Sequence, residues 1–183
     1  MSRYPVYVTG NEQKARYFAD MIGLPIERVA VDVSEIQSLS LREIVEHKAK
    51  EAYELLQQPV IVEDTALWFS ALGNLPGPLI KWFLQELDAD GLCQLLNSFT
   101  DRSARAGAAI AVYDGVDMTV FESEIEGSIV DEPKGASGFG WNMIFIPDGS
   151  DKTLGEMDET TFKSYYQKVK PFRETARFLR EKY

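Results

Sequence analysis

Short apolar runs alternate with helix-like repeats along the first 65 residues, and this alternation limits the possible folds more than any other feature. Residues 4–8 are typical of a short buried strand, and Thr9-Gly10-Asn11 follow as turn and cap residues. Apolar side chains then recur at the spacing of one helix face, at Ala15, Phe18, Ala19 and Ile22. Gly23 and Pro25 indicate the end of this helix.

The pattern then repeats. Val29, Val31 and Val33 alternate with more polar residues, which predicts a half-buried strand. Ser40 and Glu43 match a capping box and predict the start of a second helix. Its apolar stripe comprises Leu41, Ile44, Val45, Ala49, Ala52 and Leu55, with Lys48 in the middle. Residues 59–62 are wholly apolar, as in a central strand, which we expect to end at residues 63–65.

The second half of the chain adds helices and a hairpin. Helices are predicted after Gly77-Pro78, with proline in the first turn, and over residues 90–97, 159–168 and 171–182. Residues 104–130 read as a hairpin around Asp114-Gly115, and residues 145–146 as a short strand. We therefore predict an α/β protein with a mixed sheet, forming one domain over residues 1–183.

Composition restricts the classes of partner and the cellular compartment that we expect for this protein. The formal net charge of −10 and the lack of a basic stretch make a polymeric nucleic-acid partner unlikely. No window approaches the roughly 18 apolar residues of a membrane span, and the start has no apolar signal region. The single cysteine, Cys93, rules out an intrachain disulfide and is expected to be a buried apolar residue. A cytoplasmic location is expected.

The first candidate site is the segment from Thr9 to Lys14. A strand, a glycine turn and a helix N-terminus together present free amides and a helix dipole to an anion, and Lys14 adds a full positive charge. The segment does not have the spacing of a Walker loop. The alternative is a plain capped helix, and this motif alone does not decide between the two.

The second candidate is the acidic run Glu63-Asp64-Thr65. Adjacent carboxylates repel each other unless a cation is near, and Mg²⁺ accepts one or two protein carboxylates together with substrate phosphates. Glu35, after the alternating strand, is a third carboxylate that could join them. The alternative is a solvated acidic turn.

Two lysines and one loop complete the candidates. Lys48 and Lys81 each stand in an apolar context, where a lysine either snorkels to solvent or faces a cleft. The loop of residues 137–142 has two glycines around Phe139, then Trp141 and Asn142, so it could stack a base and hydrogen-bond its edge. The alternative is a loop held to the core by its two aromatic rings.

Other catalytic chemistries have little support. His47 is the only histidine, lies among charged residues of a predicted helix and is expected to be exposed. With one histidine and one cysteine, a zinc site or a Ser-His-Asp or Cys-His nucleophile is not supported.

Taken in order, these segments resemble the inosine triphosphate pyrophosphatase family, which removes deaminated purine nucleotides such as ITP, dITP and XTP. The matching segments are residues 8–14, 62–65, 71–84 and 139–141, with smaller matches at 145–149 and 156–157. They follow the order of the family and cover most of the chain. The resemblance implies an elongated mixed sheet with flanking helices, two lobes around a central substrate cleft, and a homodimer.

The resemblance also implies residue roles. Thr9, Gly10, Asn11 and Lys14 would hold the triphosphate, and Lys48 would reach a phosphate. Glu35 and Asp64 would bind Mg²⁺, or Mn²⁺ as a substitute, with Glu63 beside them. Asp64 would hold the metal or act as the general base for water, and the sequence leaves open which of Glu63 and Asp64 touches the metal directly. The remaining substrate contacts would come from Thr65, Lys81, Phe139, Gly140 and Trp141.

The chain departs from the family where the family reads the base. Asn142 stands where an aspartate is usual, and Tyr166-Gln167-Lys168 replace a Ser-His-Arg motif. Lys163 is displaced by one residue from a family lysine. An asparagine side chain can donate or accept, whereas an ionised aspartate only accepts. The hypothesis is that hydrolysis is retained while base preference is altered or relaxed.

The sequence thus predicts a magnesium-dependent hydrolase that cleaves a nucleoside triphosphate to a monophosphate and pyrophosphate. Two alternatives stay open. One is a related pyrophosphatase with a shifted base specificity, and the other is a nucleotide-binding protein without catalytic activity.

Overall fold

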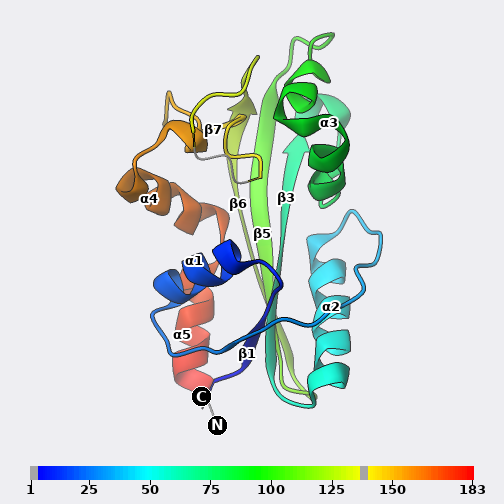
Figure 1. Ribbon diagram of the computed structural model, residues 1–183, viewed down its shortest axis with the longest axis vertical. Coiled ribbons are helices and arrows are strands. Elements are labelled where there is room, and N and C mark those ends of the chain that lie inside the picture. Colours follow the sequence, from blue (N-terminus) through cyan, green and yellow to red (C-terminus); the bar gives the residue numbers. More distant parts are fainter. Residues whose placement is uncertain (1–3, 137–139) are drawn as a thin grey trace. The chain divides into compact units, whose positions relative to one another are not determined.

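The computed structural model describes residues 4–136 and 140–183, and the chain divides into two compact units. The first unit comprises Met1–Asp64, Ala108–Ser123 and Lys170–Tyr183, and the second comprises Thr65–Gly107 and Glu124–Val169. Three long strands contribute residues to both units: β3 (Val60–Phe69), β5 (Ser103–Tyr113) and β6 (Met118–Ile129). Figure 1 shows the order of the elements along the chain.

The sheet is mixed, as predicted. β1 (Val6–Val8) lies between β2 (Arg28–Val29) and β3 and is parallel to both. The strand order then continues through β5 and β6 to β7 (Phe145–Pro147). β7 pairs antiparallel with β6, and β4 (Pro76–Gly77) pairs antiparallel with β3. The described residues therefore form seven strands and five helices, which confirms the α/β prediction.

The first unit has three helices, α1 (Glu12–Ile22), α2 (Leu41–Leu56) and α5 (Phe172–Lys182). Figure 1 shows α1 and α5 on one side of the strands of this unit and α2 on the other. The core contact between α1 and the sheet is aromatic, because Phe18 stacks on Tyr7 with ring centroids 3.9 Å apart. The same Phe18 ring meets Phe172 of α5 edge-on at 5.9 Å.

Local signals explain the helix starts and ends. The side chain of Asn11 accepts a hydrogen bond from the amide of Lys14, and Gly23 ends α1 in the left-handed conformation at φ 61°. Ser40 caps α2 by accepting from the amide of Glu43 at 3.3 Å. The Glu43 carboxylate binds the hydroxyl of Ser38, and that hydroxyl accepts from the Ser40 amide. The second bond of the predicted capping box, from the Ser40 amide to the Glu43 carboxylate, is therefore indirect and passes through the Ser38 hydroxyl.

The second unit carries α3 (Ile80–Gln94) and α4 (Glu159–Val169), with short 3-10 turns at Ser70–Leu72 and Leu154–Glu156. Arg102 links α3 to the end of β6, since its guanidinium donates to the carbonyls of Cys93, Ile129 and Val130. Gly127 packs tightly against β7, where a Cβ would lie 2.2 Å from the carbonyl oxygen of Ile146.

Several sequence expectations were wrong in detail. Residues 63–65 lie inside β3 rather than at its end, and β2 covers only Arg28–Val29 of the strand expected to reach Val33. The two helices expected near residues 78–97 are not among these errors, because α3 is interrupted by a non-helical residue, Asp88, with φ 54° and ψ −168°. Pro78 precedes this helix rather than lying in its first turn. Leu55, expected on the buried stripe, is 56% exposed.

Other expectations are confirmed. The hairpin turns at residues 114–117, and the last two helices lie where predicted. Cys93 is buried, and burial raises the pKa of its thiol to about 11. His47 is exposed. Among the described helices, none is both long and apolar enough to cross a membrane.

Candidate functional site

The turn from Thr9 to Lys14 leaves several amide groups available to a ligand. The Asn11 amide donates to the Thr9 hydroxyl at 3.1 Å, and the Lys14 amide donates to the Asn11 side chain at 3.0 Å. The N–H groups of Gly10, Glu12 and Gln13 donate to none of the described residues. Three amides without a partner among the described residues therefore lie at the N-terminus of α1, where the helix dipole is positive, and such a site can bind an anion.

Arg28 of β2 holds the other side of the same turn. Its Nε donates to the carbonyl oxygen of Thr9 at 3.0 Å, and its Nη2 donates to that of Gly10 at 3.1 Å. Its Nη1 lies 3.5 Å from the Glu12 carboxylate. Because a peptide carbonyl and the next amide point in opposite directions, fixing both carbonyls also fixes the direction of the amides that follow them.

Glycine at position 10 is not required by the protein's own packing. A Cβ placed there would meet no heavy atom within 4 Å. The open space at Gly10 lies beside the unused amides, so it is available for a ligand to approach the backbone.

Glu63 is buried at the centre of an ion-pair cluster. The Lys170 ammonium donates to Glu63 Oε1 at 2.6 Å, and the Lys14 ammonium lies 3.4 Å from the same oxygen. Glu63 is 3% exposed and Lys170 is 2% exposed. Burial raises the pKa of Glu63, but the charges of the two lysines outweigh it and bring that pKa to about 2. Glu63 is therefore a carboxylate at neutral pH.

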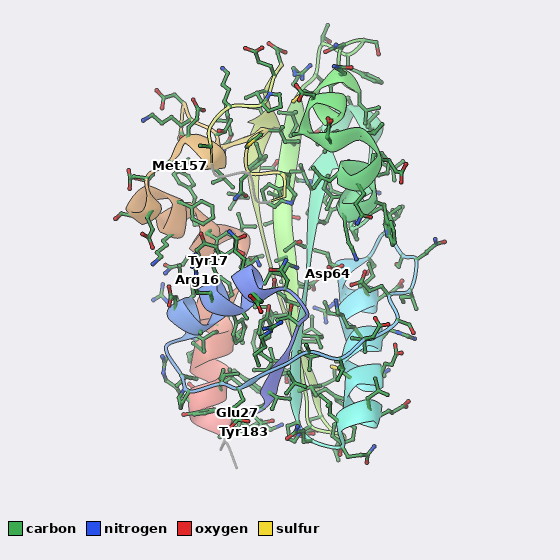
Figure 2. The ribbon with its side chains drawn as sticks, viewed as in Figure 1. Arg16, Tyr17, Glu27, Asp64, Met157 and Tyr183 are labelled. Atoms are coloured by element: carbon green, nitrogen blue, oxygen red, sulfur yellow. The ribbon has the colours of Figure 1, made fainter. Side chains whose placement is uncertain are left out.

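Asp64 and Thr65 follow on β3, and both are half-buried (Figure 2 labels Asp64). Successive side chains of an extended strand point to opposite faces. Asp64 therefore projects from the face of β3 opposite to the one from which Glu63 reaches Lys14 and Lys170. The structure thus separates the two neighbouring carboxylates that the sequence suggested as a pair.

Lys48 is paired with Glu35, which explains a lysine on the apolar stripe of α2. Its ammonium donates to Glu35 Oε1 at 2.9 Å, and its side chain is 14% exposed. Two residues that the sequence singled out for separate reasons therefore lie together. Within residues 4–136 and 140–183, no three His, Cys, Asp or Glu side chains form a cluster that could by itself hold a metal ion.

In the second unit, the loop residues after position 139 are ordered by the core. Trp141 is 8% exposed and meets Phe145 edge-on at 5.7 Å, and Asn142 is 6% exposed. Gly140 adopts a left-handed backbone with φ 61°, and a Cβ there would meet no heavy atom within 4 Å. The predicted base-stacking residue Phe139 lies outside the described residues.

The remaining predicted contacts lie on helices of the same unit. Lys81 on α3 lies over the Trp82 ring at 5.2 Å. On α4, Lys163 pairs with Glu159 at 2.9 Å and Lys168 lies over the Tyr165 ring at 4.6 Å. Gln167 and Lys168 are exposed, whereas Tyr166, at the serine position of the family motif, is buried and stacks on Phe162.

Sequence reasoning missed two charged residues, Arg28 and Lys170. In the sequence, Arg28 is one of the polar residues that alternate with Val29, Val31 and Val33, so the pattern marks it only as an outward residue of a strand. Lys170 lies 107 positions from its partner Glu63 in the sequence. Its one local signal is a lysine between Val169 and Pro171, both of which are buried.

Comparison with known proteins identifies the family of this chain. The profile of the Ham1 family matches residues 5–178. An inosine triphosphate pyrophosphatase of Yarrowia lipolytica is 40% identical over 182 residues, covering 97% of this chain and 96% of that protein. Inosine triphosphate pyrophosphatase 2 of Trypanosoma cruzi is 42% identical over 156 residues, covering 83% and 80%.

Solved structures share the fold. The Staphylococcus aureus Ham1 protein superposes with a TM-score of 0.83 at 22% identity, over 98% of this chain and 100% of that one. A HAM1 protein from Coxiella burnetii superposes with a TM-score of 0.84 at 20% identity, over 97% and 99%. The match of the family profile to nearly the whole chain, together with relatives at about 40% identity, shows that this chain belongs to the Ham1 family.

Proposed function

We propose that this protein hydrolyses nucleoside triphosphates to nucleoside monophosphates and pyrophosphate, with deaminated purines (ITP, dITP and XTP) as its substrates. The observation that carries the proposal is the turn before α1, where three unused amides and the Lys14 side chain gather at one helix N-terminus. Relatives that are about 40% identical and named inosine triphosphate pyrophosphatase support the same activity.

The chemistry of the donors fits a magnesium ion that arrives with the substrate. Mg²⁺ takes oxygen ligands, keeps several waters and uses one or two protein carboxylates together with substrate phosphates. Asp64 and Glu35 are the two carboxylates that would hold it, and Mn²⁺ would fit the same oxygen donors. When bound, the ion neutralises charge on the triphosphate and makes the α-phosphorus more electrophilic.

The chain's own residues supply the rest of the reaction. Asp64 orients the attacking water and accepts its proton, while the amides of the turn bind the phosphates. Lys14, Lys48 and Lys81 offset the negative charge of the phosphates and of the leaving pyrophosphate. Water adds to the α-phosphorus and the bond to the bridging oxygen breaks, so one water and one triphosphate give one monophosphate and one pyrophosphate.

Residues of the second unit would read the base. Trp141 would contribute the edge of a largely buried ring, and Asn142, also largely buried, an amide that both donates and accepts. Gln167 and Lys168 would contribute exposed donors. Because Asn142, Gln167 and Lys168 differ from the residues usual in the family, the preference among ITP, XTP, GTP and ATP is where this chain would depart from its relatives.

The test is pyrophosphate release from ITP, dITP, XTP, GTP, ATP and dUTP with magnesium, with Asp64→Asn as the inactive control. Preference for ITP, dITP or XTP would support the proposed substrate class. A flat or shifted profile would support a related pyrophosphatase with a new base specificity. Binding without release from any nucleotide would support the non-catalytic alternative and overturn the proposal.

The proposal extends to the form in which the enzyme works, a homodimer in the cytoplasm. The absence of disulfides in a chain with one buried cysteine is compatible with a reducing compartment. Sedimentation or light scattering of the purified protein gives the assembly directly, and a monomeric mass at micromolar concentration would overturn the dimer.

A further inference from the structure

We propose that Glu63 and Lys170 are positioning residues for Lys14, and that Glu63 is not a ligand of the metal. This inference rests on the proposed function, since it assigns a purpose to two buried charges beneath the phosphate-binding turn. The inference is based on the geometry of two lysines, Lys14 and Lys170, that contact the same carboxylate oxygen of Glu63.

Both lysines approach Oε1 of Glu63, but at different distances. Lys170 makes a direct hydrogen bond of 2.6 Å, whereas Lys14 stops at 3.4 Å. Charge-assisted N–H···O bonds are usually about 2.7–2.9 Å long. The carboxylate therefore has one close partner, Lys170, and holds the second lysine in place without a full hydrogen bond.

Burial separates the two lysines as well. The side chains of Glu63 and Lys170 are 2% and 3% exposed, while that of Lys14 is 19% exposed. One carboxylate and two ammonium groups leave one positive charge, and it lies on the member that reaches solvent. Lys170 thus neutralises Glu63 and leaves the charge of Lys14 available to a phosphate.

The position of Glu63 on β3 argues against a metal-binding role. Its side chain lies on the face of the strand opposite to Asp64, and both lysines occupy its surroundings. The other oxygen of Glu63, Oε2, is buried, so a magnesium ion could reach it only by entering the core beside two ammonium groups that would repel it.

Removing Lys170 should therefore weaken phosphate binding through Lys14. In Lys170→Met, the buried Glu63 carboxylate keeps Lys14 as its one cationic partner, and the KM for ITP should rise about tenfold as Lys14 is drawn to the carboxylate. In the double variant Glu63→Gln with Lys170→Met, that attraction is gone, and the KM should fall back toward the wild-type value. Lys170→Arg, which keeps the charge, should be affected less than Lys170→Met.

A matched control is Lys182→Met, which removes another ion-paired lysine of the same unit. Lys182 binds Asp114 and Asp117 near the C-terminus, away from the turn, so its loss should leave the KM unchanged. If the Glu63–Lys170 pair only stabilises the fold, Lys170→Met will lower the melting temperature with an unchanged KM, and the double variant will not lower the KM relative to the single one. Either result overturns the proposal.

The metal assignment is tested by titrating magnesium at saturating ITP. The double variant should need the same magnesium concentration for half-maximal rate as the wild type. A rise of tenfold or more would make Glu63 a metal ligand and overturn its assignment as a positioning residue.

Failure of the proposed function would be recognised separately. If the wild type releases pyrophosphate from no triphosphate, the Kd of inorganic tripolyphosphate for the same variants decides the inference. The order wild type, double variant, Lys170→Met, from tight to weak, supports positioning. Equal Kd values, or no binding to the wild type, overturn it.

Discussion

The two units hold their candidate residues in different ways. In the first unit, polar contacts fix each charged group: Arg28 holds two carbonyls of the turn, Glu35 pairs with Lys48, and Glu63 lies between two lysines. In the second unit, Trp141 and Tyr166 are packed by aromatic neighbours, and Gln167 and Lys168 are exposed on α4. Phosphate chemistry depends on fixed charges, and polar contacts supply them in the first unit. The candidate base readers of the second unit divide into buried side chains, Trp141 and Asn142, and exposed ones, Gln167 and Lys168.

The largest effect is expected at Asp64. Asp64→Asn keeps the size of the side chain but removes the proton acceptor, so kcat for ITP should fall by about 10²–10⁴-fold. The KM should change far less than kcat, because the phosphate-binding amides and Lys14 are untouched and the asparagine carbonyl oxygen can still face the metal. Steady-state pyrophosphate release measures both values. Near-normal kcat in this variant would show that Asp64 is not the base.

Substitution of Arg28 tests whether activity depends on the fixed geometry of the turn before α1. Arg28→Ala frees the carbonyls of Thr9 and Gly10, so the peptide groups that carry the Gly10 and Asn11 amides are no longer held and kcat/KM should fall about thirtyfold. Arg28→Lys can restore one hydrogen bond but not both, so it should recover part of the loss. Equal activity of both variants and the wild type would show that the turn holds its shape unaided.

Two glycines, one from each unit, should give opposite results. Gly10→Ala places a methyl group in open space, so the free energy of unfolding should stay within about 1 kcal/mol of wild type. The KM for ITP should rise about tenfold, because the methyl group stands where a phosphate approaches the amides. Kinetics and denaturant unfolding measure the two effects.

Gly127→Ala is the counterpart in the second unit. Its Cβ would lie 2.2 Å from the Ile146 carbonyl oxygen, so stability should fall while the KM of the folded fraction stays the same. If Gly10→Ala instead lost stability with an unchanged KM, the space at Gly10 would not be a ligand site.

Base selectivity should change only when residues of the second unit are substituted. Asn142→Asp replaces a group that donates and accepts by one that only accepts, which favours the ring N–H of a 6-oxopurine over adenine. The ratio of kcat/KM for ITP to that for ATP should rise several-fold. Inhibition by tripolyphosphate should be unchanged, since the turn before α1 is untouched. The exposed Asn97→Asp is the control for added charge, and an equal change there would remove the argument for Asn142.

The same contrast explains what the sequence could predict. Helix caps at Asn11 and Ser40 and the hairpin turn at Asp114 use neighbours a few residues apart, so local patterns identified them. The length of β3 did not follow from local patterns. Its three polar residues look like the end of a strand, and Glu63 is tolerated inside because Lys170, 107 residues away, neutralises it.

The candidate site divides along the same line. Candidate residues that follow a strand or begin a helix could be identified from the sequence. The structure then shows that two of the candidates, Lys48 and Glu35, form an ion pair. Arg28 and Lys170 act through partners in other segments, so nothing in their own neighbourhood distinguishes them from surface charges. The break at Asp88 within α3 belongs with the local signals, because the Asp88 side chain accepts a hydrogen bond from the Gly91 amide at 3.0 Å, as a helix cap does.

The smallest effect concerns stability at the hairpin end of the first unit. A hydrogen bond from Lys182 and the amides of the turn lower the pKa of Asp114 to about 2. Because the pKa is lower in the folded state, this carboxylate stabilises the fold above its unfolded pKa of about 3.9. That contribution, about 1 kcal/mol for a partly exposed pair, should be lost as the pH falls from about 5 toward 2.

Asp114→Asn keeps the acceptor for the turn amides and removes the charge, so wild type and variant should differ in unfolding free energy at pH 7 and converge near pH 2. Asp117→Asn, which removes the weaker partner of Lys182 at 3.4 Å, should show a smaller difference. A constant difference across this pH range would mean that the pair contributes through packing rather than charge. The first unit would then resemble the second, where aromatic packing holds the candidate residues.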